Sequence, residues 1–71
     1  MELLIGYHIK RLRLKHGLTQ REMAEHLRVS AQAVSKWEAG LNYPDITLLR
    51  PIADLLGVTL DELFERKGAD R

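Results

Sequence analysis

Two short helices joined by a very tight turn, between residues 18 and 44, constrain the fold of this 71-residue chain more than any other feature. Thr19-Gln20-Arg21-Glu22 has the pattern of a capping box, in which the threonine and glutamate side chains bond each other's backbone amides at a helix start. Ser30 is a preferred N-cap residue for the second helix, and Gly40 is a residue that commonly ends one. Only Leu27-Arg28-Val29 joins the two, so the segment predicts a helix, a turn and a second helix.

The second of these helices has one apolar side and one polar side. Val34 and Trp37 mark its inner face, whereas Gln32, Ser35 and Lys36 lie on its outer face. Trp37 fits the core better than an exposed platform on which bases could stack. A short helix that turns small and polar side chains outward fits the major groove of DNA, where base edges offer hydrogen-bond donors and acceptors. An ordinary solvent-exposed helix face carries similar residues, so this pattern alone leaves both interpretations open.

The rest of the chain predicts three more helices and no strand. Ile5, Ile9 and Leu12 recur with the helical period, and Thr59-Leu60-Asp61-Glu62 is a second capping box that opens the last helix. Asp45 is a suitable N-cap for the fourth helix, in which Pro51 removes one backbone hydrogen bond and predicts a kink or a 3₁₀ first turn. The fold class is therefore all-α, with helices at about residues 4–16, 20–27, 31–39, 46–56 and 60–65.

Composition and charge narrow the class of protein. The chain has no cysteine, so it forms neither disulfides nor thiolate metal sites, and the cytoplasm is the expected location. No apolar run approaches about 18 residues, the length of a membrane span, so no membrane partner is expected. Residues 1–43 carry seven Lys/Arg against four Asp/Glu, a net of +3, whereas residues 44–71 carry four against six, a net of −2. A polyanion is therefore expected to approach the first half of the chain.

No constellation of catalytic or metal-binding residues stands out. His8, His16 and His26 lie on different segments, and we expect them to face solvent rather than to bind a metal. Asp61-Glu62 at a helix start are explained by capping and by the helix dipole. We therefore expect neither an enzyme nor a cofactor, and no small-molecule ligand is evident.

The order of motifs along the whole chain resembles one known family. LTQREMAEHLRVSAQAVSKWEAG, followed by a proline and by LLRPIADLLGVTLDEL, resembles the lambda-repressor-like helix-turn-helix domains of the phage repressor, Cro and XRE group. The match covers about residues 5–65, nearly the whole chain. The resemblance implies a compact five-helix domain over residues 1–67, with 68–71 as a tail or the start of a linker. It also implies sequence-specific binding to double-stranded DNA and a role in regulating transcription.

The same resemblance implies roles for individual residues. The helix from Ser30 to Ala39 would lie in the major groove. Arg13 and Glu38 match a pair that links the first and third helices in this family, and such a partly buried ion pair fixes geometry more than it adds stability. The residues implied to read base edges are Ala31, Gln32, Ser35 and Lys36. The residues implied to bind phosphates are Gln20, Arg28, Ser30, Asn42 and Tyr43.

The chain departs from the family pattern at Arg28, where glycine is common in the turn. A residue with a side chain must tolerate a left-handed or bridging backbone there, at a cost of about 1 kcal/mol. We expect local strain at this position. The arginine also adds a basic group beside the edge that would face DNA.

The resemblance further implies a homodimer on a pseudo-palindromic site, with half-sites about one helical turn apart. The expected dimer surface lies near the fifth helix, where Leu55, Leu60 and Phe64 are candidates if they are exposed. The alternative is a helical protein-interaction module, such as an antitoxin-like partner, in which DNA binding is secondary or lost. Gln32 and Lys36, flanked by small residues, favour DNA binding because an interaction module does not need them on its outer face.

Overall fold

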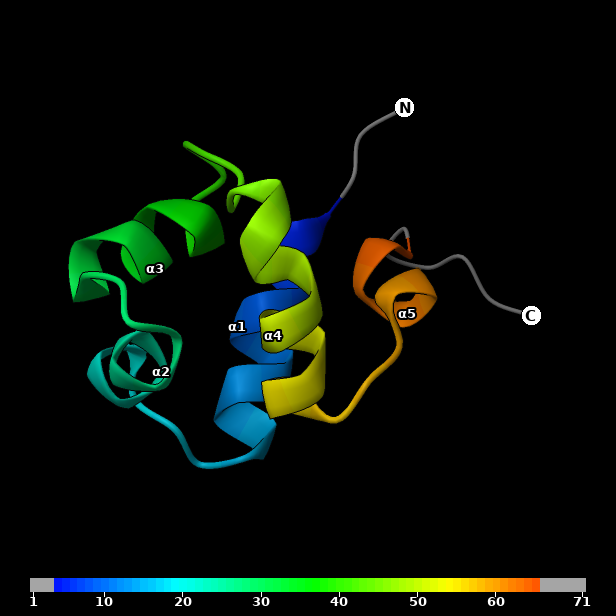
Figure 1. Cartoon of the computed structure of the whole chain (residues 1–71), viewed down its shortest axis with the longest axis horizontal. Helices are drawn as coiled ribbons and strands as arrows, with labels where there is room; N and C mark the ends of the chain where they lie inside the picture. Colours follow the sequence, from blue (N-terminus) through cyan, green and yellow to red (C-terminus); the bar gives the residue numbers. More distant parts are fainter. Residues whose placement is uncertain (1–3, 66–71) are drawn as a thin grey trace.

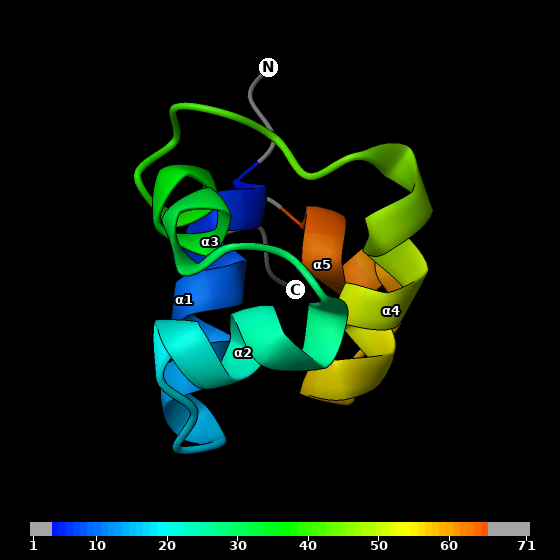
Figure 2. The same cartoon turned by 60° about the vertical axis from the view of Figure 1, so that its left-hand side comes forward.

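The computed structural model describes residues 4–65, and within that range the chain forms five helices and no strand, as predicted. The helices are α1 (Ile5–Lys15), α2 (Gln20–Leu27), α3 (Ala31–Glu38), α4 (Ile46–Leu56) and α5 (Leu60–Phe64). α2 and α3 lie at one end of the molecule and α5 at the other, with α1 and α4 between them (Figure 1). A short turn connects α2 to α3, and a longer loop leads from α3 to α4 (Figure 2). The predicted tail at 68–71 lies outside the described residues.

The helix starts follow the capping signals in the sequence. Thr19 Oγ1 accepts a hydrogen bond from the Glu22 amide at 3.0 Å, and the Glu22 carboxylate accepts from the Thr19 amide at 2.9 Å. Thr59 and Glu62 form the second capping box, with the equivalent bonds at 3.1 and 2.9 Å. Asp45 caps α4 by accepting from the amide two residues further on, at 3.0 Å. These bonds satisfy backbone amides that have no partner inside a helix.

α4 continues as one helix from Ile46 to Leu56, with Pro51 inside it. In its first turn, the Leu48 amide donates to the Asp45 carbonyl at 2.8 Å, three residues back. An i→i+3 bond of this kind belongs to a 3₁₀ turn. The Ala33 amide makes the same kind of bond to the Ser30 carbonyl, at 3.0 Å, at the start of α3, which contains no proline. The bond is therefore no sign of an effect of Pro51, and the kink or 3₁₀ turn predicted there stays a prediction.

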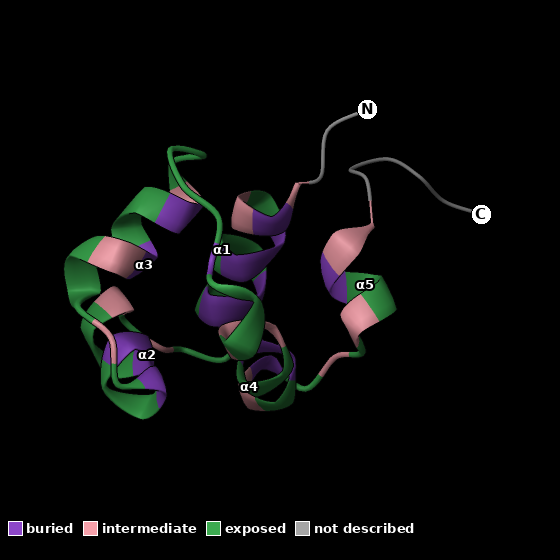
Figure 3. Cartoon of the chain, turned by 45° about the horizontal axis from the view of Figure 1, so that its top comes forward, coloured by how far each residue is buried: buried purple, intermediate pink, exposed green. Residues whose placement is uncertain are grey.

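A single hydrophobic core joins all five helices. Ile9, Met23, Val34, Ile52 and Leu63, one from each helix, are fully buried. The buried residues gather on the sides of the helices that face the centre of the molecule (Figure 3). Since a small domain buries a limited area, each of these positions contributes a large share of its stability.

Two histidines tie α1 to the C-terminal ends of other helices, and His8 corrects the prediction that the histidines face solvent. His8 is 5% exposed, and its Nε2 donates to the carbonyl of Glu65, directly after α5. Its Nδ1 accepts from Arg11 Nη2 at 3.3 Å. His16 is exposed as predicted, but its Nε2 donates to the Leu56 carbonyl at the end of α4, at 2.8 Å. Local sequence could not predict these bonds because the partners are 57 and 40 residues away.

Candidate nucleic-acid interface

α3 has a core-facing side and a solvent-facing side. Val34 is fully buried and Trp37 is 5% exposed, which confirms that Trp37 belongs to the core. Residues three and four apart lie one above the other on a helix, so the remaining positions form a stripe on the opposite side. All four residues predicted to read bases lie exposed on this stripe: Ala31, Gln32, Ser35 and Lys36.

The turn before α3 adopts the strained backbone that the sequence predicts. Arg28 has φ of 61° and ψ of 43°, in the left-handed region that normally suits glycine. The turn is closed by a bond from the Val29 amide to the Ala24 carbonyl at 3.0 Å. The Arg28 side chain is exposed, so its charge is available to a ligand beside the start of α3.

Ser30 sets the start of α3. Its Oγ accepts a hydrogen bond from the Ala33 amide at 3.1 Å and so caps the helix. A serine hydroxyl has one proton to donate in addition to its acceptor lone pairs. The capping bond therefore leaves the Ser30 hydroxyl able to donate to an anionic oxygen near the N-terminal end of α3, where the helix dipole favours negative charge.

An ion pair fixes α3 against α1. Arg13 Nε donates to Glu38 Oε2 at 2.7 Å and Arg13 Nη2 donates to Glu38 Oε1 at 3.0 Å. The two side chains are only 8% and 4% exposed, which makes this the partly buried pair expected from the family resemblance. Arg13 Nη1 also donates to the Leu18 carbonyl at 2.8 Å, so the same guanidinium holds the segment before α2.

The ion pair also stabilises the charged form of Arg13. The hydrogen bond with Glu38 raises the pKa of Arg13, the attraction of the Glu38 charge adds to the effect, and burial opposes it. Arg13 therefore remains a cation when bound in this network. The charge of Glu38 is matched within the protein rather than presented to a ligand.

Gln20 joins this network through its side chain. Its Nε2 donates to Glu38 Oε1 at 3.0 Å, which links the first residue of α2 to the last residue of α3. The sequence predicted a phosphate-binding role for Gln20 but not this bond, which spans 18 residues. Gln20 is the first residue of α2, so the bond ties the start of this helix to the end of α3. The arrangement leaves the Gln20 amide oxygen and one N–H for other partners.

Gly6 is a structural requirement that sequence reasoning missed. A Cβ built at this position would lie 2.1 Å from the Trp37 carbonyl oxygen, far inside any real contact distance. α1 and the C-terminal end of α3 therefore approach through their backbones. The only local signal was a glycine inside a helix, where glycine costs about 1 kcal/mol relative to alanine and so calls for a packing reason.

The loop after α3 carries the two remaining predicted phosphate contacts. Asn42 and Tyr43 are both exposed on the loop that leads to α4. The Leu41 amide donates to the Lys36 carbonyl at 2.9 Å, which directs the chain away from the end of the helix. The structure thus places these two side chains beyond the C-terminal end of α3, and Gln20 and Ser30 at the starts of α2 and α3.

The part of the chain that the structure describes offers no competing site for a metal. Within residues 4–65 no three His, Cys, Asp or Glu side chains come together in a way that could hold an ion. In the same range, no helix has the length and apolar character needed to cross a bilayer.

Comparisons with known proteins agree with this geometry. A family model described as helix-turn-helix matches residues 9–63. The HTH-type transcriptional activator BcrR of Enterococcus faecalis is 46% identical over 56 residues, which cover 79% of this chain and 28% of BcrR. The prophage-derived HTH-type regulator YopO of Bacillus subtilis is 32% identical over 62 residues, covering 87% of this chain and 89% of YopO.

Solved structures show the same fold. The P22 c2 repressor, solved in complex with a synthetic operator, superposes with a TM-score of 0.83 at 26% identity, covering 90% of this chain and 97% of that one. SinR, a master regulator of biofilm formation solved in complex with DNA, has a TM-score of 0.78 at 31% identity, covering 86% and 98%.

The fold, the exposed stripe on α3 and these matches define the class. The chain belongs to the helix-turn-helix family, in the lambda-repressor-like group of DNA-binding transcriptional regulators. It spans 28% of the length of BcrR and 57% of that of YonR, another B. subtilis prophage-derived regulator.

Proposed function

We propose that this protein binds double-stranded DNA by placing α3 in the major groove, and that it regulates transcription from the site it reads. The observation that carries the proposal is the exposed stripe of Gln32, Ser35 and Lys36, directly opposite the buried Val34 and Trp37. Gln can pair with the adenine edge and Lys with guanine, and the Ala31 methyl can contact a thymine methyl. The protein would act in the cytoplasm, as a binding module with no catalytic step.

Phosphate contacts would orient α3 in the groove. Gln20 and Ser30 lie at the starts of α2 and α3, where backbone amides favour an anion. Asn42 and Tyr43 lie past the other end of α3, and Arg28 lies in the turn before it. Contacts at both ends of a reading helix set its register, while base edges supply the specificity.

A single copy covers only a few base pairs, so we propose that two copies bind a pseudo-palindromic site, with half-sites about one helical turn apart. The solved relatives support the DNA-binding part of this proposal, since P22 c2 repressor and SinR were both solved in complex with DNA. Leu55, Leu60 and Phe64 remain candidates for the dimer surface. Each is partly buried against the core of its own copy, which leaves only part of each side chain for a partner.

Selection of bound DNA from a random pool, at about 0.1 M salt, tests the function directly. Sequence-specific binding predicts enrichment of one motif, and a homodimer predicts that the motif is an inverted repeat. A pool that stays random after repeated rounds would contradict DNA reading and favour the alternative of a protein-interaction module.

Gln32→Ala then tests the role of α3 on the selected site. We expect a loss of about 1–3 kcal/mol on that site and relaxed specificity at one or two base pairs. Gln20→Ala is the matched comparison, because it should weaken binding evenly across sequences and leave the preferred motif unchanged. Both affinities are measured by fluorescence anisotropy on the selected site and on unrelated DNA. Equal losses for Gln32→Ala on both DNAs would rule out its base-reading role.

A further inference from the structure

α1 carries a second apolar stripe that the core does not use. Its inner side contributes Ile5, Ile9 and Leu12, but Tyr7 and Leu14 point outward and are 41% and 58% exposed. Together with Leu4, which is the N-cap residue of α1, and the charged Arg11, they fall at positions 4, 7, 11 and 14, which is the a/d spacing of a heptad. A surface helix normally has one apolar face, so we asked what could cover the exposed Tyr7 and Leu14 on the other side of α1.

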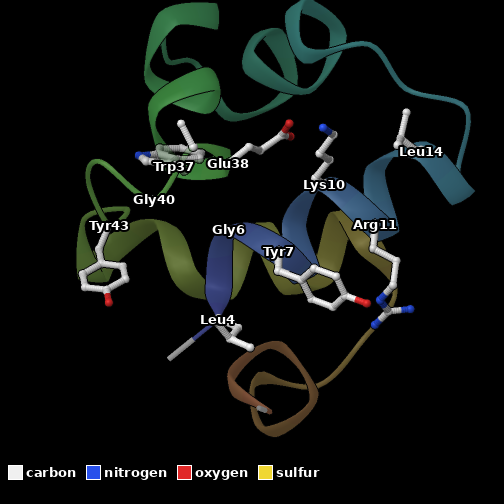
Figure 4. A pocket seen from close by; sticks show the side chains of 11 residues that line it. Leu4, Gly6, Tyr7, Lys10, Arg11, Leu14, Trp37, Glu38, Gly40 and Tyr43 are labelled. Atoms are coloured by element: carbon white, nitrogen blue, oxygen red, sulfur yellow. The ribbon is translucent and has the colours of Figure 1, made fainter. Parts of the chain in front are cut away.

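The stripe borders a groove between α1 and the C-terminal end of α3. The groove has a volume of about 460 Å³, and Gly6 lets its two walls approach closely. Figure 4 shows Tyr7, Arg11 and Leu14 along α1, with Trp37 and Glu38 of α3 forming the opposite wall. Gln32, Ser35 and Lys36 do not line this groove, whereas Tyr43, one of the proposed phosphate contacts, does.

The charge of the groove selects the kind of partner. Lys10 and Arg11 both line it, and Figure 4 shows Lys10 rising from α1 toward the end of α3. Glu38 is the only acid in the lining, and its carboxylate is already bonded to Arg13 and Gln20. The uncompensated charge of the groove is therefore positive within the described residues.

We propose that this groove docks an amphipathic helix of another protein, whose apolar stripe covers Tyr7 and Leu14 and whose flanking acidic residues pair with Lys10 and Arg11. The mode is that of a helix lying in a groove, with anchors at heptad spacing. A second copy of this chain is a poor occupant, because two α1 helices packed side by side would bring Lys10 and Arg11 near their own counterparts. The docked helix would leave Gln32, Ser35 and Lys36 exposed. It would meet the proposed DNA contacts only at Tyr43, so we expect the protein to hold its partner while bound to DNA.

A designed peptide pair tests the charge requirement. The probe is a fluorescein-labelled helical peptide of about 20 residues, long enough to form a helix, with leucine at the a and d positions and glutamate beside them. The control peptide has lysine in place of each glutamate. We expect the acidic peptide to bind at least about tenfold more tightly by anisotropy, a difference of about 1.4 kcal/mol. The double variant Lys10→Glu/Arg11→Glu should reverse the preference. Equal affinities for the two peptides, or no binding of either, would overturn the proposal.

A matched pair of surface variants tests whether the peptide binds in this groove. Leu14→Ser removes an exposed leucine from the groove, and Ile46→Ser removes an isoleucine that is 79% exposed outside it. Both should retain the helical circular dichroism and the thermal transition of the unmodified protein, because neither side chain is buried. Only Leu14→Ser should lower the affinity of the protein for the acidic peptide. Equal weakening by both would mean that the peptide binds exposed apolar residues without regard to the groove.

The relation to DNA binding is tested separately. The peptide is titrated into the protein alone and into the protein saturated with its selected DNA site. Unchanged affinity supports a groove that stays open on DNA. Displacement of the peptide by DNA would place the groove inside the DNA interface and overturn the proposal, without affecting the proposed function itself.

Discussion

The two helix-turn-helix units of this protein, α2 to α3 and α4 to α5, are built on the same local plan but differ at the left-handed residue of the turn. The first turn reads Ala24-x-x-Leu27-Arg28-Val29-Ser30, and the second reads Ala53-x-x-Leu56-Gly57-Val58-Thr59. In each, a left-handed residue is followed by a valine whose amide donates to the alanine carbonyl at 3.0 Å, and then by a capping hydroxyl. The left-handed residue is Gly57 in the second unit and Arg28 in the first, with φ of 73° and 61°.

This difference contrasts the backbone conformation that the turn requires with the side chain that the surface presents. Glycine is the unstrained choice at a left-handed position, and the second unit, which belongs to the scaffold, has it. The first unit, which leads into the proposed reading helix, accepts a strain of about 1 kcal/mol. What it gains is an exposed cation beside the start of α3.

The two units also differ in how α1 holds them. The first is held by the bonded network of Arg13, Glu38 and Gln20. The second is held by hydrogen bonds to the backbone, in which His8 and His16 donate to carbonyls at the ends of α5 and α4. The network has strict geometry, which suits a helix whose side chains must meet base edges at fixed positions.

The largest expected effect tests whether both units depend on one core. Trp37→Ala should lower the free energy of unfolding by about 3–5 kcal/mol, and Leu63→Ala by about 2–5 kcal/mol, because each leaves a cavity. Both values are measured by urea denaturation, with Leu14→Ala as an exposed control expected to change little. Destabilisation by Trp37→Ala of less than about 1 kcal/mol would mean that α3 is attached more loosely than α5.

Glu38→Gln disrupts the network of Arg13, Glu38 and Gln20, which holds the first unit against α1. The variant keeps an acceptor oxygen but loses the charge that Arg13 needs, so we expect a loss of about 1.5–3 kcal/mol in stability, the range for hydrogen bonds to charged groups. Because the network positions α3, affinity for the selected DNA should fall as well. The matched change at the second unit, His16→Gln, should leave DNA affinity nearly unchanged. Equal losses of DNA affinity in the two variants would show that the network has no special role in positioning α3.

Local signals predicted most of the fold, and contacts between helices account for what they missed. Both capping boxes and the five helices depend on residues within about four positions of each other. The left-handed backbone at Arg28 was expected from the glycine that the resembled family commonly has in this turn. The burial of His8 and the bond from Gln20 to Glu38 depend on how the helices pack together. The sequence around each residue therefore does not predict them. The Arg13–Glu38 pair was expected only because the motif order resembled a known family.

The turn itself can be tested by exchanging its residues. Arg28→Gly should raise stability by about 1 kcal/mol, and Gly57→Ala should lower it by a similar amount. A Cβ at Gly57 would lie 3.9 Å from His16 Nε2, an ordinary contact, so the second cost is conformational rather than steric. Stability is measured by urea denaturation for both variants.

Arg28→Ala separates strain from charge at the same position. It keeps the left-handed strain but removes the cation, so its stability should stay near that of the unmodified protein. If Arg28 contacts a phosphate, Arg28→Ala and Arg28→Gly should reduce the salt dependence of DNA binding equally, by about one counterion. A salt dependence that neither variant changes would leave the arginine in the turn without a DNA-binding role.

The smallest expected effect concerns the N-caps at the starts of the two units, because only one of these two caps is ionisable. α2 begins with the Thr19 hydroxyl, whereas α4 begins with the Asp45 carboxylate. Hydrogen bonds from Thr47 lower the pKa of Asp45 in the folded protein, so folding favours its charged form. The stabilisation is therefore present above the ordinary aspartate pKa of about 3.9 and is lost as the pH falls through the lower, folded value.

Asp45→Asn isolates that charge, because asparagine caps a helix about as well as aspartate does. We expect the unmodified protein to melt at a slightly higher temperature than Asp45→Asn near pH 7, since the charge also interacts favourably with the start of α4. The gap should begin to narrow as the pH falls below about 3.9, and it should be gone once the pH lies below the lower pKa that Asp45 has in the folded protein. All other acidic residues are the same in the two proteins, so their contributions cancel in the difference. A gap that stays constant from pH 7 to pH 2 would show that the cap acts through its shape and hydrogen bonds alone, as the Thr19 cap of α2 does.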